Sequence, residues 1–181
     1  MTAPKPARLF LVDDHPLVRD GLANLLQGAG FVISGQADAI QKALAHPALS
    51  QSELVIVDLA LGEESGLPLI ASLRRRDLAV LVYSMHEHAH IIRQALEAGA
   101  GGYVTKLEAS GSLLAAIRAV LKGSRFLSPR AEKALGLAEP IDALAGQQLQ
   151  IYRFLGEGLS NDEIARRLDI SVRTLESYGV R

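Results

Sequence analysis

Short apolar runs alternate with amphipathic stretches from Leu9 to about Lys122. The apolar runs, such as Leu54-Val55-Ile56-Val57, have the length and composition of buried strands. Between them, apolar residues recur at helical spacing, as in the segment from Pro16 to Gly28. Such alternation is typical of a parallel sheet that is covered by helices on both faces. The pattern therefore predicts an α/β domain built from five β–α units.

We expect the strands and helices of this domain at the following positions. The strands are predicted at 9–12, 31–35, 53–58, 79–84 and 102–105, and the helices at 16–28, 39–45, 67–75, 90–98 and 112–121. The pattern then changes, because Pro129, Gly136 and Pro140 interrupt the segment from Ser124 to Ala143. That segment is predicted to be a linker with one short helix. Helical patterning resumes at Leu144 without strand signals and predicts a second, small all-helical domain.

Composition narrows the class of protein. The chain has 181 residues, 49% of them hydrophobic, which is enough for a sizeable core. It contains no cysteine, so disulfides and cysteine-based zinc sites are excluded. The formal net charge of −1 gives no global sign of nucleic-acid binding. No apolar stretch approaches the roughly 18 residues of a membrane span, and the segment from Met1 to Arg8 does not resemble a signal peptide, so we expect a cytoplasmic protein with no membrane partner.

Polar side chains stand where four of the predicted strands end. Asp13 and Asp14 follow the first strand, Asp58 ends the third, Ser84 ends the fourth and Lys106 follows the fifth. Because the carboxyl ends of parallel strands meet at one edge of a sheet, these side chains are expected to lie together where open α/β folds bind ligands. Three carboxylates there favour a divalent cation such as Mg²⁺, and an ammonium and a hydroxyl suit a phosphoryl group. Asp58 is then a candidate nucleophile, since carboxylates can form aspartyl-phosphates.

Each of these residues also has a simpler interpretation. A single aspartate after a strand is most often a turn former or a helix cap, and a single lysine there usually faces solvent. The convergence of the whole set favours a shared function over these separate roles. His86 leaves two interpretations open: it lies over the phosphoryl position, or it is an exposed loop histidine, which is the commoner case.

The motifs around these residues resemble the receiver domain of two-component response regulators, in the subfamily that carries a LuxR-type DNA-binding domain. The resemblance covers Ala7 to about Leu127 and rests on the segments LVDDHPLVRDGL, VIVDLAL, YSMHE and AGAGGYVTK. It implies a flavodoxin-like sheet of five parallel strands in the order 2-1-3-4-5. It also implies a receiver at 7–127, a linker at 128–143 and a helix-turn-helix domain at 144–181.

The resemblance assigns a role to each residue at the sheet edge. Asp58 would accept a phosphoryl group from a histidine kinase or a small phosphodonor. The cofactor would be Mg²⁺, bound directly by Asp14, Asp58 and the Ala60 carbonyl and largely through water by Asp13. Lys106 and Ser84 would contact the phosphoryl oxygens, and Tyr103 would be the aromatic residue that turns inward as Ser84 moves. In one departure from the family pattern, an acidic, glycine-containing segment from Leu61 to Gly66 stands where a proline is frequent.

The C-terminal segment carries signals for two short helices joined by a tight turn. Ser160 and Glu163 form a capping box, and Ser171 can cap a second helix from Val172 onward. Two such helices fit a helix-turn-helix, and the stretch GLSNDEIARRLDISVRTLES resembles the LuxR-type module. The simpler alternative is an ordinary helical hairpin. If DNA is bound, the expected contacts are Arg173, Thr174, Ser177 and Arg181.

This module departs from the family pattern at several positions. Five arginines balance five carboxylates from residue 144 to residue 181, so the basic footprint of a duplex binder is missing. Glu176 stands where a lysine is usual on the recognition helix, and Gly179 weakens that helix. Gln147 and Gln148 replace a usual Arg-Glu pair. The sequence stops at Arg181, so we expect a module without its last helix, which is often used for dimerisation.

These observations predict a phosphorylation-dependent regulator of transcription rather than an enzyme, with promoter DNA as its target. The resemblance also implies a homodimer on phosphorylation, although no residue fixes the interface. One alternative is a receiver that acts only through protein contacts and carries a degenerate helical tail. A second alternative is an aspartate-nucleophile phosphatase, which the sequence disfavours because Asp58-Leu59-Ala60 lacks the second carboxylate of the usual Asp-x-Asp motif.

Overall fold

The computed structural model describes residues 4–177, with the side chains of 137–149 and of Ser177 excluded. The chain forms two compact units, Met1–Leu135 and Gly136–Arg181. Each unit has its own apolar cluster.

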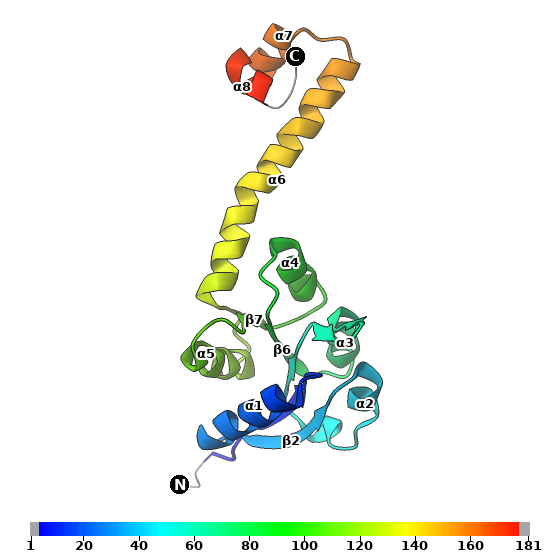
Figure 1. Cartoon of the computed structure of the whole chain (residues 1–181), viewed down its shortest axis with the longest axis vertical. Helices are drawn as coiled ribbons and strands as arrows, with labels where there is room; N and C mark the ends of the chain where they lie inside the picture. Colours follow the sequence, from blue (N-terminus) through cyan, green and yellow to red (C-terminus); the bar gives the residue numbers. More distant parts are fainter. Residues whose placement is uncertain (1–3, 178–181) are drawn as a thin grey trace. The chain divides into compact units, whose positions relative to one another are not determined.

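A six-stranded, all-parallel sheet forms the centre of the first unit (Figure 1). Its strand order is β2-β1-β3-β6-β7-β8. The strands are β2 (Val32–Ala37), β1 (Arg8–Val12), β3 (Leu54–Val57), β6 (Ala79–Ser84), β7 (Gly102–Thr105) and β8 (Phe126–Leu127). The first five follow the predicted order 2-1-3-4-5, so the predicted topology is confirmed. The prediction of five strands is wrong by one, because β8 is a sixth strand at the edge of the sheet. Its two residues are too few to give a strand pattern in the sequence.

Helices cover both faces of the sheet. One face packs on α1 (Pro16–Gly28) and α5 (Ser110–Leu121), and the other on α2 (Ile40–Ala45), α3 (Leu67–Arg74) and α4 (Ala89–Glu97). Successive residues of β1 alternate between the two cores: Leu9 and Leu11 face α1 and α5, whereas Phe10 and Val12 face the other three helices. This two-sided burial explains why the strands read as continuous apolar runs.

Two small elements outside the six-stranded sheet were not predicted. The acidic segment after Asp58 is a two-stranded antiparallel hairpin, formed by β4 (Ala60–Leu61) and β5 (Glu64–Ser65). Gly62 in its turn has φ 64°, a left-handed conformation that glycine adopts without strain. A single 3₁₀ turn, η1 (Leu49–Gln51), precedes β3.

The segment predicted to be a linker with one short helix has a different structure. Residues 126–127 extend the sheet, and α6 (Pro129–Gly156) then runs for 28 residues without a break. Pro129 begins the helix, where its missing N–H costs nothing, but Pro140 lies within it, contrary to the predicted interruption at that residue. No helix in the described part of the chain is both long enough and apolar enough to cross a membrane. The domain boundaries 7–127, 128–143 and 144–181 stay predictions.

The second unit contains the end of α6 followed by α7 (Asn161–Arg167) and α8 (Val172–Ser177). The predicted capping box is confirmed: the Ser160 side chain accepts from the Glu163 N–H, and the Glu163 carboxylate accepts from the Ser160 N–H at 2.8 Å. A small core of Ile151, Ile164 and Leu175 joins the three helices. The second unit therefore has the all-helical architecture that the sequence predicted.

Gly66 connects the hairpin to α3 at a point where a side chain has no room. A Cβ built on this residue would collide with the backbone of Asp58 and Leu59. We expect Gly66→Ala to lower the free energy of unfolding by about 1–3 kcal/mol, the usual cost of overpacking. Gly111 in α5 has nothing within 4 Å of such a Cβ, so Gly111→Ala should be neutral or stabilising by up to about 1 kcal/mol. Urea denaturation of both variants checks this, and an equal effect at the two sites would contradict it.

Candidate functional site

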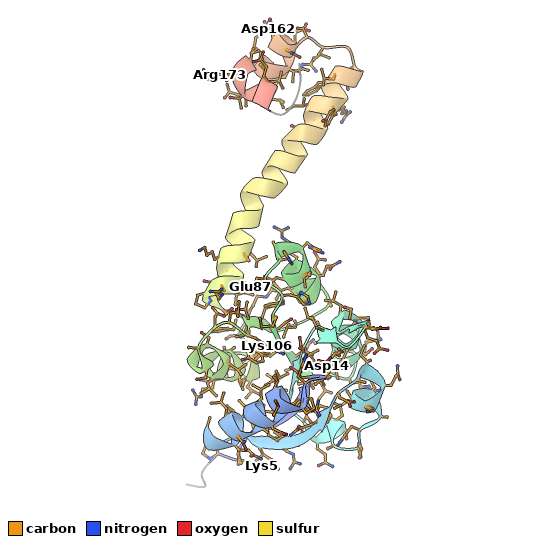
Figure 2. The ribbon with its side chains drawn as sticks, in the orientation of Figure 1. Lys5, Asp14, Glu87, Lys106, Asp162 and Arg173 are labelled. Atoms are coloured by element: carbon orange, nitrogen blue, oxygen red, sulfur yellow. The ribbon has the colours of Figure 1, made fainter. Side chains whose placement is uncertain are left out.

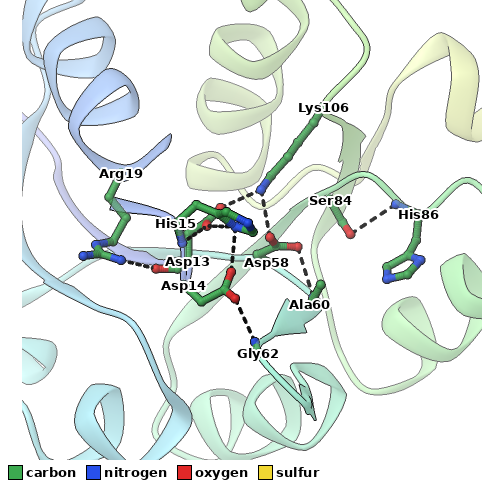
Figure 3. A network of polar contacts seen from close by, with 10 residues as sticks. All are labelled: Asp13, Asp14, His15, Arg19, Asp58, Ala60, Gly62, Ser84, His86 and Lys106. Carbon is green, nitrogen blue, oxygen red and sulfur yellow. Dashed lines mark hydrogen bonds and ion pairs between the residues drawn. The ribbon is translucent and has the colours of Figure 1, made fainter. Parts of the chain in front are cut away.

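The sheet places the predicted site residues at its carboxyl edge. Asp13 follows β1, Asp58 follows β3, Ser84 ends β6 and Lys106 follows β7. Figure 3 shows the Lys106 side chain reaching Asp13 and Asp58, with Ser84 to one side of them and hydrogen-bonded to His86. Three of them are almost completely buried: Asp13 is 2% exposed, Asp58 4% and Ser84 0%. Buried carboxylates require compensation, because transfer of a charge from water is costly unless it is paired.

Lys106 provides that compensation. Its Nζ donates to Asp13 Oδ2 at 2.6 Å and to Asp58 Oδ2 at 2.8 Å. Its side chain is 11% exposed, so burial disfavours the charged ammonium, but the hydrogen bonds to the two carboxylates outweigh burial and raise the pKa of Lys106 above its usual value. The ammonium is therefore charged at neutral pH and bridges the first and third strands of the chain.

Asp14 lies at the outer side of this cluster. Its Oδ2 accepts from the Gly62 N–H of the hairpin at 2.8 Å, and its Oδ1 is 2.8 Å from His15 Nδ1. His15 was not predicted as a site residue, although its position directly after Asp13-Asp14 was a signal in the sequence. Its N–H donates to Asp13 Oδ1 at 2.8 Å. The loop after β1 therefore holds both carboxylates in place.

The carboxylates of this edge have the geometry and chemistry of a metal site. Ligand atoms of Asp13, Asp14, His15 and Asp58 all lie within 4.8 Å of one another. Three carboxylates form a hard oxygen donor set of the kind that Mg²⁺ prefers. Ala60, whose carbonyl was predicted as a further ligand, lies in β4, and its N–H donates to Asp58 Oδ1 at 3.2 Å. The residues present therefore fit a divalent cation.

Ser84 and Tyr103 are linked through the backbone of one residue. The His86 N–H donates to Ser84 Oγ at 3.3 Å, and Tyr103 Oη donates to the His86 carbonyl at 2.7 Å. The Tyr103 ring is completely buried, and burial raises the pKa of its hydroxyl well above the usual value. The aromatic residue that was predicted to turn inward thus already points inward in this structure. The His86 side chain lines a hollow together with Ala60 and the turn of the hairpin.

The residues predicted to contact DNA lie on α8. Arg173 and Thr174 are exposed, and the neighbouring Glu176 is exposed as well. The Thr174 hydroxyl is 2.7 Å from Ser171 Oγ, which also accepts from the Thr174 N–H, so part of its hydrogen-bonding capacity is used at the helix start. The side chain of Ser177 and the whole of Arg181 lie outside the described residues, as does Gly179.

Comparisons with known proteins agree with both units. A family model described as the response regulator receiver domain matches residues 9–118. A second model, described as bacterial regulatory proteins of the luxR family, matches residues 142–180. The DNA-binding transcriptional activator DevR/DosR of Mycobacterium tuberculosis is 33% identical over 186 residues, which cover 96% of this chain and 85% of that protein.

Solved structures show the same relationship. The crystal structure of a LuxR-family two-component response regulator from Aurantimonas sp. SI85-9A1 matches with a TM-score of 0.70 and 32% identity, over 74% of this chain and 98% of that one. A structure of the two-component response regulator RcsB in complex with DNA matches with a TM-score of 0.68 and 26% identity, over 96% of this chain and 88% of that one. The similarity thus extends over both units of the chain.

The bridge made by Lys106 has a measurable effect on stability. Lys106→Met keeps the stem of the side chain but leaves Asp13 and Asp58 without their shared cation, so we expect the free energy of unfolding at pH 7 to fall by about 2 kcal/mol. This is less than the roughly 3–5 kcal/mol for breaking a fully buried pair, because Lys106 keeps some contact with water. Lys42→Met, which removes an exposed pair with Asp38, should cost less than about 1 kcal/mol.

The pH dependence of this effect has a defined sign. Because the folded-state pKa of Lys106 lies above the ordinary value of 10.5, its contribution is fully present below that pH and is lost only as the pH rises through the higher folded-state pKa. The difference between wild type and Lys106→Met should therefore stay constant from pH 7 to pH 9. A difference that disappears within that window would rule out the bridge as its cause.

Proposed function

Since this chain belongs to the response regulators that combine a receiver domain with a LuxR-type DNA-binding domain, we propose that Asp58 is its phosphoacceptor. A histidine kinase or a small phosphodonor supplies the phosphoryl group, and Mg²⁺ is the cofactor. A carboxylate oxygen of Asp58 forms the new bond to phosphorus while the bond to the donor breaks. The observation that carries this proposal is the burial of Asp58 beside Asp13 and Asp14, with Lys106 at 2.8 Å.

The neighbouring residues have separate tasks in this reaction. Asp14, Asp58 and the Ala60 carbonyl would hold Mg²⁺ directly and Asp13 largely through water, and the ion would supply positive charge beside the transferring group. Lys106 is within reach of Asp58 and provides a second cation for the phosphoryl oxygens. The buried site also limits access of water, which would otherwise hydrolyse the product.

Ser84 and Tyr103 form the proposed switch. A phosphoryl group on Asp58 adds negative charge and strong hydrogen-bond acceptors. Ser84 moves toward these oxygens and carries the backbone of His86 with it, because the His86 N–H is bonded to Ser84 Oγ. The bond from Tyr103 to the His86 carbonyl then changes. Phosphorylation of Asp58 thereby alters the contacts of Tyr103. Its ring is already buried, so it does not have to move from solvent into the domain.

The output of the switch is binding to promoter DNA, with a homodimer formed on phosphorylation. Arg173, Thr174, Ser177 and Arg181 are the proposed contacts. The match to the luxR family favours this output over the alternative of a receiver with a degenerate helical tail. The two family models that match the chain describe a receiver domain and a luxR-family regulator, which favours a regulator over the phosphatase alternative.

Labelling of Asp58 tests the central step. With Mg²⁺ and acetyl phosphate, the intact chain should gain the mass of one phosphoryl group, and the label should be lost at alkaline pH, as expected of an acyl phosphate. Asp58→Asn should abolish the label, whereas Asp77→Asn, at an exposed aspartate in the turn between α3 and β6, should leave it unchanged. Peptide mapping by mass spectrometry gives the position. Persistent labelling of Asp58→Asn would sink the assignment.

The charge of α8 gives a second prediction. Glu176 is exposed next to Arg173 on the proposed recognition helix, and its carboxylate should repel DNA phosphates. We expect Glu176→Lys to raise affinity for duplex DNA by about tenfold and to steepen the salt dependence by about one unit. Glu157→Lys makes the same charge change at an exposed position before α7 and serves as the control. Equal gains in the two variants, measured by fluorescence anisotropy at several salt concentrations, would show that only net charge matters.

A further inference from the structure

Two glutamates hold the first turn of α6. Arg130 Nε donates to Glu87 Oε1 at 2.6 Å, and the Arg130 backbone N–H donates to Glu108 Oε1 at 2.8 Å. Glu87 lies in the loop between β6 and α4, and Glu108 in the loop between β7 and α5. Figure 2 shows Glu87 beside the start of the helix. All three residues belong to the first compact unit, so these contacts are internal to it.

Both loops begin at residues of the functional site. Glu87 is three residues after Ser84, and Glu108 is two residues after Lys106. The two loop starts are also bonded to each other, since the Lys106 N–H donates to the Ser84 carbonyl at 2.9 Å. Few backbone bonds separate Ser84 from Glu87 and Lys106 from Glu108. A displacement of Ser84 or Lys106 is therefore transmitted to a glutamate that contacts Arg130.

The start of α6 also contacts β7, the strand that precedes Lys106. The Ser128 side chain is completely buried, and its Oγ accepts from the Thr105 N–H and from the Ala131 N–H, each at 3.4 Å. Its own N–H donates to the Tyr103 carbonyl at 3.0 Å. Tyr103, whose hydroxyl holds the loop of His86, thus also holds the residue that caps α6. The helix start is therefore connected to Tyr103 and Thr105 of β7 and to Glu108 in the loop that follows.

We propose that Arg130 is a latch that couples the state of Asp58 to the first turn of α6. This inference rests on the proposed phosphorylation of Asp58. A phosphoryl group placed between Asp58 and Lys106 takes the space of their present hydrogen bond, so Lys106 and the loop to Glu108 must move. Ser84, drawn to the phosphoryl oxygens, moves the loop to Glu87. Phosphorylation therefore weakens both contacts of Arg130 and loosens the first turn of α6.

The strength of the ion pair suits such a role. The Glu87 side chain is 35% exposed and that of Arg130 48%, so the pair is screened by water and contributes little to overall stability. The hydrogen bond to Arg130 lowers the pKa of Glu87, which keeps the carboxylate charged at neutral pH. A contact of this size can be broken by a movement of the loop without unfolding the domain. A buried pair could not be released at a comparable cost.

Amide hydrogen exchange of the full chain tests the latch, with the mass spectrometric readout confined to residues 130–135. In wild type, Mg²⁺ with beryllofluoride, an analogue of the phosphoryl group, should speed exchange in this segment about two- to fivefold over Mg²⁺ alone, the range that an exposed ion pair can supply. Glu87→Gln should show this faster exchange without beryllofluoride and gain little more on its addition. Arg130→Lys, which keeps the charge, should lie between the two.

The controls separate this inference from the proposed function. Glu157→Gln, which removes another exposed ion pair of α6, should leave exchange at 130–135 as in wild type. Labelling of Asp58 by acetyl phosphate should be the same in Glu87→Gln and in wild type. If wild type is labelled but exchange at 130–135 is insensitive both to beryllofluoride and to Glu87→Gln, the latch is wrong and the phosphoacceptor stands. If Asp58 is never labelled, both the proposed function and the latch are contradicted.

Discussion

The bridge from Lys106 to Asp13 and Asp58 is the interaction on which the functional edge depends. Two carboxylates of this site are almost fully buried, and without a cation each would raise the energy of the other. The single ammonium satisfies both and joins the ends of three strands that are far apart in the sequence. A site held by one ammonium is well suited to ligand binding. An arriving phosphoryl group or metal ion changes only the ion pairs of Lys106 and the carboxylates, and the strands keep their positions.

The position of this site followed from the sequence because parallel strands impose it. Once the apolar runs before Asp13, Asp58 and Lys106 are read as neighbouring parallel strands, their next residues have to meet at one edge. The loops could not be derived in this way. Whether His15 contacts Asp14, and whether Gly62 donates to it, depends on backbone angles and on a hairpin that no periodicity encodes.

The largest error of sequence reading concerned α6, and its cause is a conflict between local signals. Pro140 and Gly136 indicated a break, whereas the residues around them, rich in alanine and leucine, favour a helix. Propensity summed over many residues outweighed two unfavourable positions. In the same way, β8 is a strand only because the exposed edge of β7 pairs with it, which is a tertiary effect and not a property of Phe126 and Leu127.

The start of α6 combines two kinds of attachment that differ in how easily they are changed. Ala131 is completely buried and packs in the core formed with α2, α3 and α4, while Arg130 beside it makes exposed polar contacts. A shift of a loop by a fraction of a hydrogen-bond length can break the contacts of Arg130, but it leaves the apolar contact of Ala131 in place, because dispersion and burial vary slowly with small movements. Signalling through this turn should therefore change the dynamics of an attached helix and not detach it from the domain.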